Sequence, residues 1–287
     1  MTADLERHPI EGEAPPLGTL YGVGAGPGAS DLLTLRAVRV LESVEVIALP
    51  RSSDFGASVA WEIIAPIIGS RPSQERLRLT FPMTKDPDCV RPHVDAAVEA
   101  IGKALLAGRS VAFVTEGDPS VFSTFGYVRK EALRRWPALR VEVVPGITSI
   151  TAVAALGCVP LADGQERIAI LPATYGVEDL VHVLQRFDTV VLMKLGGQMP
   201  AILAALEQTG LTDSAFFVSK ATMAEERIEH DVRRLKDEHG GCFSMLMVKR
   251  KDRSFVLLGE VPPRAHASTD PGTPGASPQA RNERDSP

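Results

Sequence analysis

Residues 19–33 read TLYGVGAGPGASDLL, a short apolar run followed by a glycine-rich loop. The chain then continues into a segment of helical length at 32–43. A strand, a glycine-rich turn and a helix in this order are typical of the first βα unit of an α/β domain that binds a small molecule. The glycines at positions 22, 24, 26 and 28 carry no side chain, so we expect a ligand to approach this backbone closely. Taken alone, the loop fits ordinary turn chemistry equally well.

The rest of the chain repeats the alternation of apolar runs and amphipathic segments. This pattern predicts an α/β protein built from βαβ units around a largely parallel sheet. Strands are expected at 19–24, 44–49, 76–79, 110–115 and 140–144, and in a second series at 167–171, 189–193, 214–219 and 242–248. Helices are expected at 32–43, 58–64, 93–107, 123–135, 147–156, 177–186 and 200–208, with Ser30 or Asp31 capping the first.

Changes in composition along the sequence divide the chain into four parts. The turn-rich segment VPLADGQ at 159–165 separates the two strand series. We therefore expect a loose N-terminal extension at 1–16, an N-terminal α/β domain at 17–158, a C-terminal α/β domain at 159–263 and a disordered tail at 264–287. The tail is almost free of large apolar residues and cannot bury enough surface to offset its ordering entropy.

Composition excludes several classes of protein. The formal net charge of −5 argues against non-specific binding of nucleic acid, which requires clustered cations. The three cysteines are far apart and form no CxxC pair, so neither a disulfide framework nor a metal site is expected. Because an apolar run of about 18 residues is absent from the sequence, we expect a cytoplasmic protein with no membrane partner.

Three further strand ends carry polar residues where α/β sheets bind ligands. TEGDPSVFSTFGYV at 115–128 offers Glu116 and Asp118, whose carboxylates would accept hydrogen bonds from a ligand or cap the next helix. VVPGITSITA at 143–152 offers Thr148 and Ser149, again as ligand contacts or as simple caps. VVLMKLGG at 190–197 offers a methionine that packs on a heterocycle or in the core, and a lysine for an anion.

Taken together and in this order, GVGAGPGASDLLTLRAVRVL, EGDPSVFSTF, VVPGITS, VVLMKLGG and SKATMAEERI resemble the tetrapyrrole methylase superfamily over residues 17–248. FPMTKDP at 81–87, the STF segment and CFSMLMV at 242–248 make the precorrin-2 C(20)-methyltransferases of cobalamin biosynthesis the most similar family. The resemblance implies two α/β domains with S-adenosyl-L-methionine in the cleft between them. It also implies a homodimer and a trough in which the tetrapyrrole lies against the donor methyl.

Carried over residue by residue, the resemblance implies donor contacts for ten positions. They are Gly24, Pro27, Glu116, Gly117, Asp118, Val121, Thr148, Ser149, Met193 and Ala221. Two departures stand out, since Leu49-Pro50 lacks an aromatic before the proline and Ala29 stands where these loops often have Asp. We expect Asp118→Ala to weaken donor binding with little loss of stability.

The implied reaction needs an in-line carbon nucleophile and exclusion of water more than a strong acid or base. Asp118 or Glu116 would stabilise the cationic macrocycle that forms. The substrate carboxylates would meet Arg51, Lys85, Arg129 and Lys194, chosen from a larger group that also contains Arg91, His93 and Lys130.

We expect methylation of precorrin-2 at carbon 20 to give precorrin-3A. The alternatives are cobalt-precorrin-2, another ring position, and a macromolecular acceptor, which the acidic charge disfavours when it is RNA. A nucleotide-binding oxidoreductase or sensor module would need an acidic residue after the second strand, where Leu49, Pro50 and Arg51 offer none.

Overall fold

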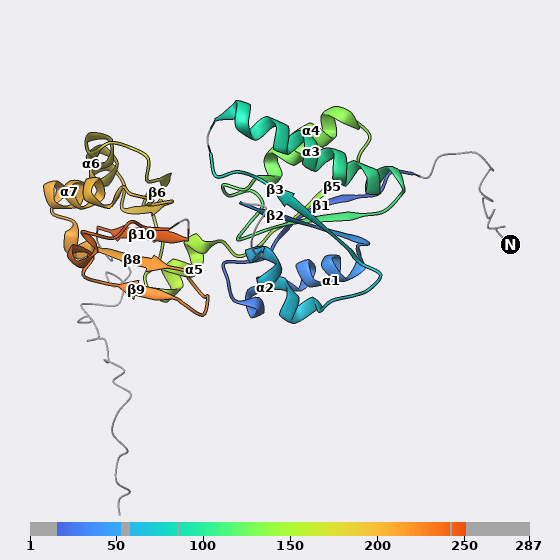
Figure 1. Ribbon diagram of the computed structural model, residues 1–287. Coiled ribbons are helices and arrows are strands. Elements are labelled where there is room, and N and C mark those ends of the chain that lie inside the picture. Colours follow the sequence, from blue (N-terminus) through green and yellow to red (C-terminus); the bar gives the residue numbers. More distant parts are fainter. Residues whose placement is uncertain (1–15, 53–57, 85, 242, 251–287) are drawn as a thin grey trace, which may run out of the picture. The chain divides into compact units, whose positions relative to one another are not determined.

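The computed structural model describes residues 16–52, 58–84, 86–241 and 243–250. Lys85, Cys242, the predicted tail and all of the predicted N-terminal extension except Pro16 therefore lie outside the described residues. Within the described part of the chain the strands form two five-stranded sheets (Figure 1). The α/β class predicted from the sequence is confirmed.

The first sheet has the order β3-β2-β4-β1-β5, and each printed pairing in it is parallel. Its strands are β1 (Leu20–Gly24), β2 (Val46–Arg51), β3 (Glu75–Thr80), β4 (Val111–Thr115) and β5 (Val141–Val144). These are the five strands expected in the first series. The register pairs Gly24 with Thr115 and Val23 with Val144, so β1, β4 and β5 end at the same edge. Their following loops are brought together there.

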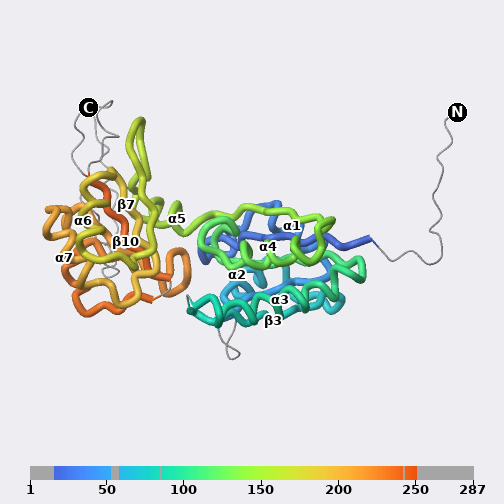
Figure 2. Tube along the Cα trace, turned by 90° about the horizontal axis from the view of Figure 1, so that it is seen from above, coloured from blue at the N-terminus to red at the C-terminus, as the bar shows by residue number. Residues whose placement is uncertain are grey.

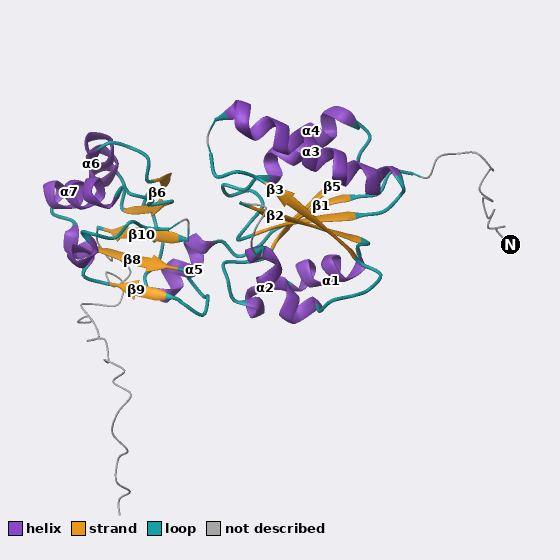
Figure 3. Ribbon diagram, viewed as in Figure 1, coloured by secondary structure: helices purple, strands orange, loops and turns teal. Residues whose placement is uncertain are grey.

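Helices cover both faces of this sheet (Figures 1 and 3). The helices α1 (Leu35–Ser43) and α2 (Val59–Ile68) pack on one face, against buried residues such as Val23 and Val114. The helices α3 (Pro87–Leu106) and α4 (Phe125–Arg135) pack on the other, against Val111 and Phe113. Burial on both faces explains why these strands read as continuous apolar runs.

The second sheet has the order β6-β7-β10-β8-β9. Its strands are β6 (Ile168–Pro172), β7 (Thr189–Met193), β8 (Ala215–Ser219), β9 (Arg227–Glu229) and β10 (Ser244–Lys249). The helices α6 (Val177–Arg186) and α7 (Met199–Thr209) lie side by side on one face (Figures 1 and 2), and α5 (Ser149–Leu156) packs on the other.

The expectation of a largely parallel sheet is wrong for this second sheet. β6 pairs with β7 in parallel, whereas β7–β10, β10–β8 and β8–β9 are antiparallel. A parallel pair needs a long crossover, usually a helix. Between β8 and β10 the chain instead forms β9, which the sequence analysis missed, and a short 3-10 turn at Val232–Leu235.

Two helix starts also differ from expectation. A 3-10 turn occupies Ser30–Leu32, and α1 begins afterwards with Thr34 as its cap, accepting a hydrogen bond from the backbone N–H of Ala37 at 3.1 Å. The helix α3 begins at Pro87, not at residue 93, with Asp86 as cap, and continues through Pro92. His93 therefore lies beyond the first helical turn. Asp86 as cap and Pro87 as the first helical residue start the helix, although Pro92 follows within it.

Candidate functional site

The loops after β1 and β4 are joined backbone to backbone at the edge where these strands end. Gly26 N–H donates to the Gly117 carbonyl at 3.2 Å, and Gly117 N–H donates to the Gly26 carbonyl at 2.7 Å. Both glycines have positive φ, +80° and +65°, a conformation that favours glycine. Two reciprocal hydrogen bonds therefore fix the two loops against each other.

Gly24 serves the packing of loop against loop. A Cβ at this position would lie 2.6 Å from both the Gly117 carbonyl oxygen and the Gly146 nitrogen. Gly28 is similarly crowded, since a Cβ there would lie 2.8 Å from the carbonyl oxygen of Ala221, in the loop after β8. The glycines were expected to open the backbone to a ligand, but at these two positions they let protein segments approach each other.

Asp118 holds the loops after β4 and β5 together. Its side chain is buried, its Oδ1 accepts hydrogen bonds from the backbone N–H (2.8 Å) and hydroxyl of Ser120, and its Oδ2 accepts one from Gly146 N–H at 2.9 Å. Burial raises the pKa of this carboxyl, but the hydrogen bonds from Ser120 and Gly146 outweigh it and lower the pKa overall. Asp118 is thus an ionised clamp and does not cap α4, whose cap residue is Thr124.

Glu116, two residues earlier, has the opposite environment. The backbone N–H groups of Glu116 itself and of Ala60, in the first turn of α2, favour the ionised form of its carboxyl. Burial nevertheless raises the pKa of Glu116 above its ordinary value. The pKa values of two carboxyl groups in one loop are therefore shifted in opposite directions.

A cavity of about 400 Å³ opens at these strand ends. Its lining includes eight of the predicted donor contacts and two of the predicted substrate cations: Pro27, Glu116, Gly117, Asp118, Val121, Thr148, Ser149, Met193, Arg51 and Lys194. Residues that are distant in the sequence, from both strand series, thus share one wall. This is the candidate site.

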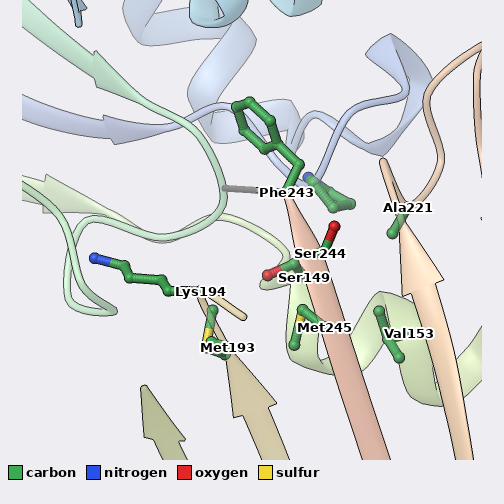
Figure 4. Close-up of a pocket in the computed structure, with 9 residues that line it drawn as sticks. Ser149, Val153, Met193, Lys194, Ala221, Phe243, Ser244 and Met245 are labelled. Atoms are coloured by element: carbon green, nitrogen blue, oxygen red, sulfur yellow. The ribbon is translucent and has the colours of Figure 1, made fainter. Parts of the chain in front are cut away.

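A smaller cavity of about 60 Å³ adds Ala221 and shares five lining residues with the larger one, namely Pro27, Ser149, Met193, Lys194 and Phe243. Figure 4 shows Met193, Ser149, Ser244 and Met245 gathered around it, with Lys194 extending away from Val153 and Ala221. Of the predicted donor positions that the structure describes, Gly24 lines neither cavity. Thr148 also caps α5, accepting a hydrogen bond from the Thr151 N–H at 3.2 Å.

Three large apolar side chains in the cavity wall are solvent-exposed and were not predicted as site residues. They are Met83 (69% exposed), Phe122 (49%) and Phe243 (39%). The Lys194 ammonium nitrogen lies 5.3 Å from the centre of the Phe122 ring. The segments FPMTKDP, STF and CFSMLMV contain or adjoin these residues, so an aromatic or methionine just outside an apolar strand was the available signal.

The backbone is strained around the same cavities. Phe122 and Lys194 have φ of 49° and 57°, and Lys220 and Thr222, on either side of Ala221, have 50° and 63°. Such conformations are rare for residues with a Cβ and gather at binding sites, where the surrounding structure enforces them. The Thr222 hydroxyl accepts a hydrogen bond from Ala29 N–H at 3.0 Å, which fixes its loop against the loop after β1.

Lys85 lies outside the described residues, and the other remaining predicted cations line neither cavity. Among the described residues, Arg129 is exposed on α4 and lines neither cavity, and Arg91 lies 4.0 Å from Asp95 on the surface of α3. Within the described ranges no group of three His, Cys, Asp or Glu side chains is placed to hold a metal ion. None of the helices described is both long and apolar enough to cross a bilayer.

Comparison with known proteins places this geometry in a family. The family model of tetrapyrrole (corrin/porphyrin) methylases matches residues 19–235. The cobalt-precorrin-2 C(20)-methyltransferase of Salmonella typhimurium is 33% identical over 240 residues, which cover 82% of this chain and 97% of that protein. The precorrin-2 C(20)-methyltransferase of a Sinorhizobium species is 32% identical over 249 residues, covering 83% and 98%.

The cobalamin biosynthesis protein CobIJ of Mycobacterium tuberculosis is 33% identical over 277 residues, covering 93% of this chain but 52% of that protein. The chain thus spans about half the length of these mycobacterial relatives. Among solved structures, a cobalt precorrin-4 methyltransferase, CbiF, aligns with a TM-score of 0.61 at 22% identity, over 80% of this chain and 94% of that one. This likeness concerns the fold.

Proposed function

The chain belongs to the family of tetrapyrrole (corrin/porphyrin) methylases, and from this premise we propose that it transfers the methyl group of S-adenosyl-L-methionine to carbon 20 of precorrin-2. The product would be precorrin-3A, on the way to the corrin ring of cobalamin. The names of the Salmonella and Sinorhizobium relatives support this ring position. The observation that carries the proposal is the 400 Å³ cavity, whose wall contains most of the residues that the resemblance assigns to the donor.

The cavity wall fits the donor's chemistry. S-adenosyl-L-methionine combines a flat heterocycle, a ribose and a positively charged sulfonium, which supplies an electrophilic methyl group. Pro27, Val121 and Met193 offer apolar surface for a heterocycle, and the hydroxyls of Thr148 and Ser149 line the same space. The carboxylates of Glu116 and Asp118 supply negative charge for a sulfonium.

The wall also fits an acceptor that is flat and carries carboxylates. Met83, Phe122 and Phe243 expose apolar surface to the cavity. Lys194 and Arg51 line it as well, so they provide local cations in a chain of net charge −5. We place the macrocycle on this apolar surface, with its carboxylates toward the two cations.

Several finer points belong to the same proposal. The resemblance supports a homodimer of two-domain chains, and the sequence pattern supports a cytoplasmic protein with domains at 17–158 and 159–263. The relatives' names include both metal-free and cobalt-bearing substrates, so the metal content of the acceptor is decided by experiment.

The decisive experiment incubates the full chain with methyl-labelled S-adenosyl-L-methionine and either precorrin-2 or cobalt-precorrin-2. Mass spectrometry then detects the transferred methyl group, and NMR locates it on the ring. We expect label at carbon 20. Label at another carbon would contradict the ring position, and failure to bind the donor in a calorimetric titration would contradict the methyltransferase itself.

A matched pair of variants tests the acceptor side. We expect Lys194→Met to raise the KM for the tetrapyrrole about tenfold, since a charge-assisted hydrogen bond contributes about 1.5–3 kcal/mol. The affinity for the donor should stay unchanged. Lys103→Met, on the exposed surface of α3, is the control and should alter neither constant. Equal KM values for both variants would remove Lys194 from the acceptor site.

A further inference from the structure

We infer that Glu116 accepts the proton that leaves the methylated ring carbon, and that Asp118, its neighbour in the same loop, takes no part in proton transfer. This inference rests on the proposed function and adds to it a residue for the second half of the reaction. It assigns different tasks to two carboxylates that the sequence alone leaves equivalent.

The chemistry requires a proton acceptor. A bridging carbon of the reduced ring carries one hydrogen and attacks the donor methyl with a pair of ring electrons. The new carbon–carbon bond forms while the carbon–sulfur bond breaks, and sulfur keeps that bonding pair as a neutral thioether. The ring is left with one positive charge. When the hydrogen on the methylated carbon leaves as a proton, its electron pair restores the double bond and the charge disappears.

The described wall of the cavity offers few groups for this proton. Arg51 and Lys194 are cations and have no acceptor while charged. The hydroxyls in the wall are weak bases, and they belong to Ser52, Thr115, Ser123, Thr124, Thr148 and Ser149. Two carboxylates remain, Glu116 and Asp118.

The hydrogen bonds separate these two carboxylates. Both oxygens of Asp118 accept hydrogen bonds from protein groups, and one of them holds Gly146 N–H at 2.9 Å. Protonation would break the clamp between the loops after β4 and β5. Glu116 lines the cavity, and its carboxyl lies near the first turn of α2, where the backbone N–H of Ala60 favours its ionised form.

The proton affinities agree with this division. Burial raises the pKa of Glu116, whereas the hydrogen bonds from Ser120 and Gly146 keep that of Asp118 low. A general base works best when its pKa lies close to the working pH, and neighbouring acids with opposed shifts commonly have different tasks.

A purely structural role for Glu116 makes a different prediction. Ser58, the cap residue of α2, makes no side-chain capping bond, and the carboxyl of Glu116 lies near the N–H of Ala60 in the first turn of this helix. If capping were its whole task, Glu116→Gln would be harmless, because an amide oxygen also accepts from that N–H. The amide does not take up the proton, so the substitution separates the two roles.

The test compares the full-length wild type with Glu116→Gln, Glu116→Asp and Glu62→Gln. Glu62 lies on the exposed side of α2 and serves as the control. Each protein receives S-adenosyl-L-methionine and precorrin-2 carrying either hydrogen or deuterium at carbon 20. The readouts are kcat, the KM for each substrate, the deuterium isotope effect on kcat and the urea midpoint.

We expect Glu116→Gln to lower kcat about 100-fold, the lower end for loss of a general base. Its KM for the tetrapyrrole and its urea midpoint should stay near those of the wild type, and a large isotope effect should appear because proton removal becomes rate-limiting. Glu116→Asp should recover part of kcat. Glu116→Gln with wild-type kcat, or with a lowered kcat and no isotope effect, would overturn the inference. A wild type that transfers no methyl group would instead refute the proposed function.

Discussion

At the scale of single residues, Asp118 shows how structure changes a reading made from sequence. Its position after a strand suggested a ligand contact, and its removal was expected to spare the fold. In the structure its carboxylate joins two loops through Ser120 and Gly146. The location of Asp118 near a ligand site was predictable, because α/β sheets bind ligands at the carboxyl ends of their strands. The partners of Asp118 were not predictable, because Gly146 is 28 residues away and is brought near only when β1 pairs with both β4 and β5.

We therefore expect Asp118→Ala to lower the free energy of unfolding by about 1–3 kcal/mol, since the Gly146 N–H loses its acceptor. Asp118→Asn keeps one carbonyl oxygen and should lose less. Urea unfolding followed by circular dichroism measures both variants. An alanine variant as stable as the wild type would show that the clamp does not contribute to stability.

Gly24 provides a second test at this scale. Gly24→Ala places a Cβ 2.6 Å from the backbone of Gly117 and Gly146, so the loops must separate. We expect a loss of about 1–3 kcal/mol in stability, as for overpacked cores, together with weaker donor binding. Gly126→Ala is the matched control, because a Cβ in this part of α4 meets no described atom within 4 Å. The control should be neutral or stabilising by up to about 1 kcal/mol.

At the scale of elements, the strands of the first sheet were predictable because each is a buried apolar run between polar segments. The residues at which the helices begin were harder to predict from the sequence. Thr34, rather than Ser30 or Asp31, caps α1, and the choice depends on the 3-10 turn that precedes it. The exposure of Phe122 was also missed, since an apolar sequence alone suggests burial, whereas this residue lies in a loop with positive φ and is 49% exposed.

The contact between α3 and α4 should be sensitive to acid. Hydrogen bonds from Arg134 and then Arg135 lower the pKa of Glu131 from 4.5 to about 2, and Arg135 also contacts Asp95 on α3 at 2.7 Å. Ionised Glu131 therefore stabilises the fold above pH 4.5, and this contribution disappears as the pH falls from 4.5 towards 2. We expect about 1–2 kcal/mol, because Arg134 is largely exposed and screened.

Glu131→Gln should lose this amount at pH 7 and show a flatter dependence of stability on pH between 4.5 and 2. Urea midpoints measured across this range for the wild type and the variant give the answer. Glu99→Gln, whose carboxylate faces Lys103 on exposed α3, is the control and should follow the wild-type curve. Parallel curves for wild type and Glu131→Gln would contradict the assignment.

At the scale of the whole molecule, two sheets of different kind follow each other in one chain. The first is parallel and its helical crossovers are visible in the sequence, whereas the second is mixed because the segment after β8 has no crossover helix among its described residues. The order of the loops was enough to indicate the family. The cavity itself needed the fold, because Met83, Phe122 and Phe243 are separated by long stretches of chain.

The second sheet contains a buried ion pair that links the segment before β6 to the end of β10. Lys249 contacts Glu166, and their side chains are 6% and 2% exposed. Glu166 also accepts a hydrogen bond from Asp163 N–H at 2.9 Å, while its Oε1 is buried without a hydrogen-bond partner among the described atoms. Both charges have lost their hydration, so removing one of them leaves the other uncompensated.

We expect Glu166→Gln to cost about 3–5 kcal/mol, because the Lys249 ammonium stays buried without its counter-charge. The double variant Glu166→Leu with Lys249→Met should recover most of this loss, since apolar replacements of a buried pair are often neutral or stabilising. Glu238→Gln breaks the more exposed pair with Arg227 and should cost less than about 1 kcal/mol. Urea unfolding measures the free energy of unfolding of the wild type and the three variants. Equal losses for Glu166→Gln and Glu238→Gln would show that burial does not make the first ion pair more important for stability.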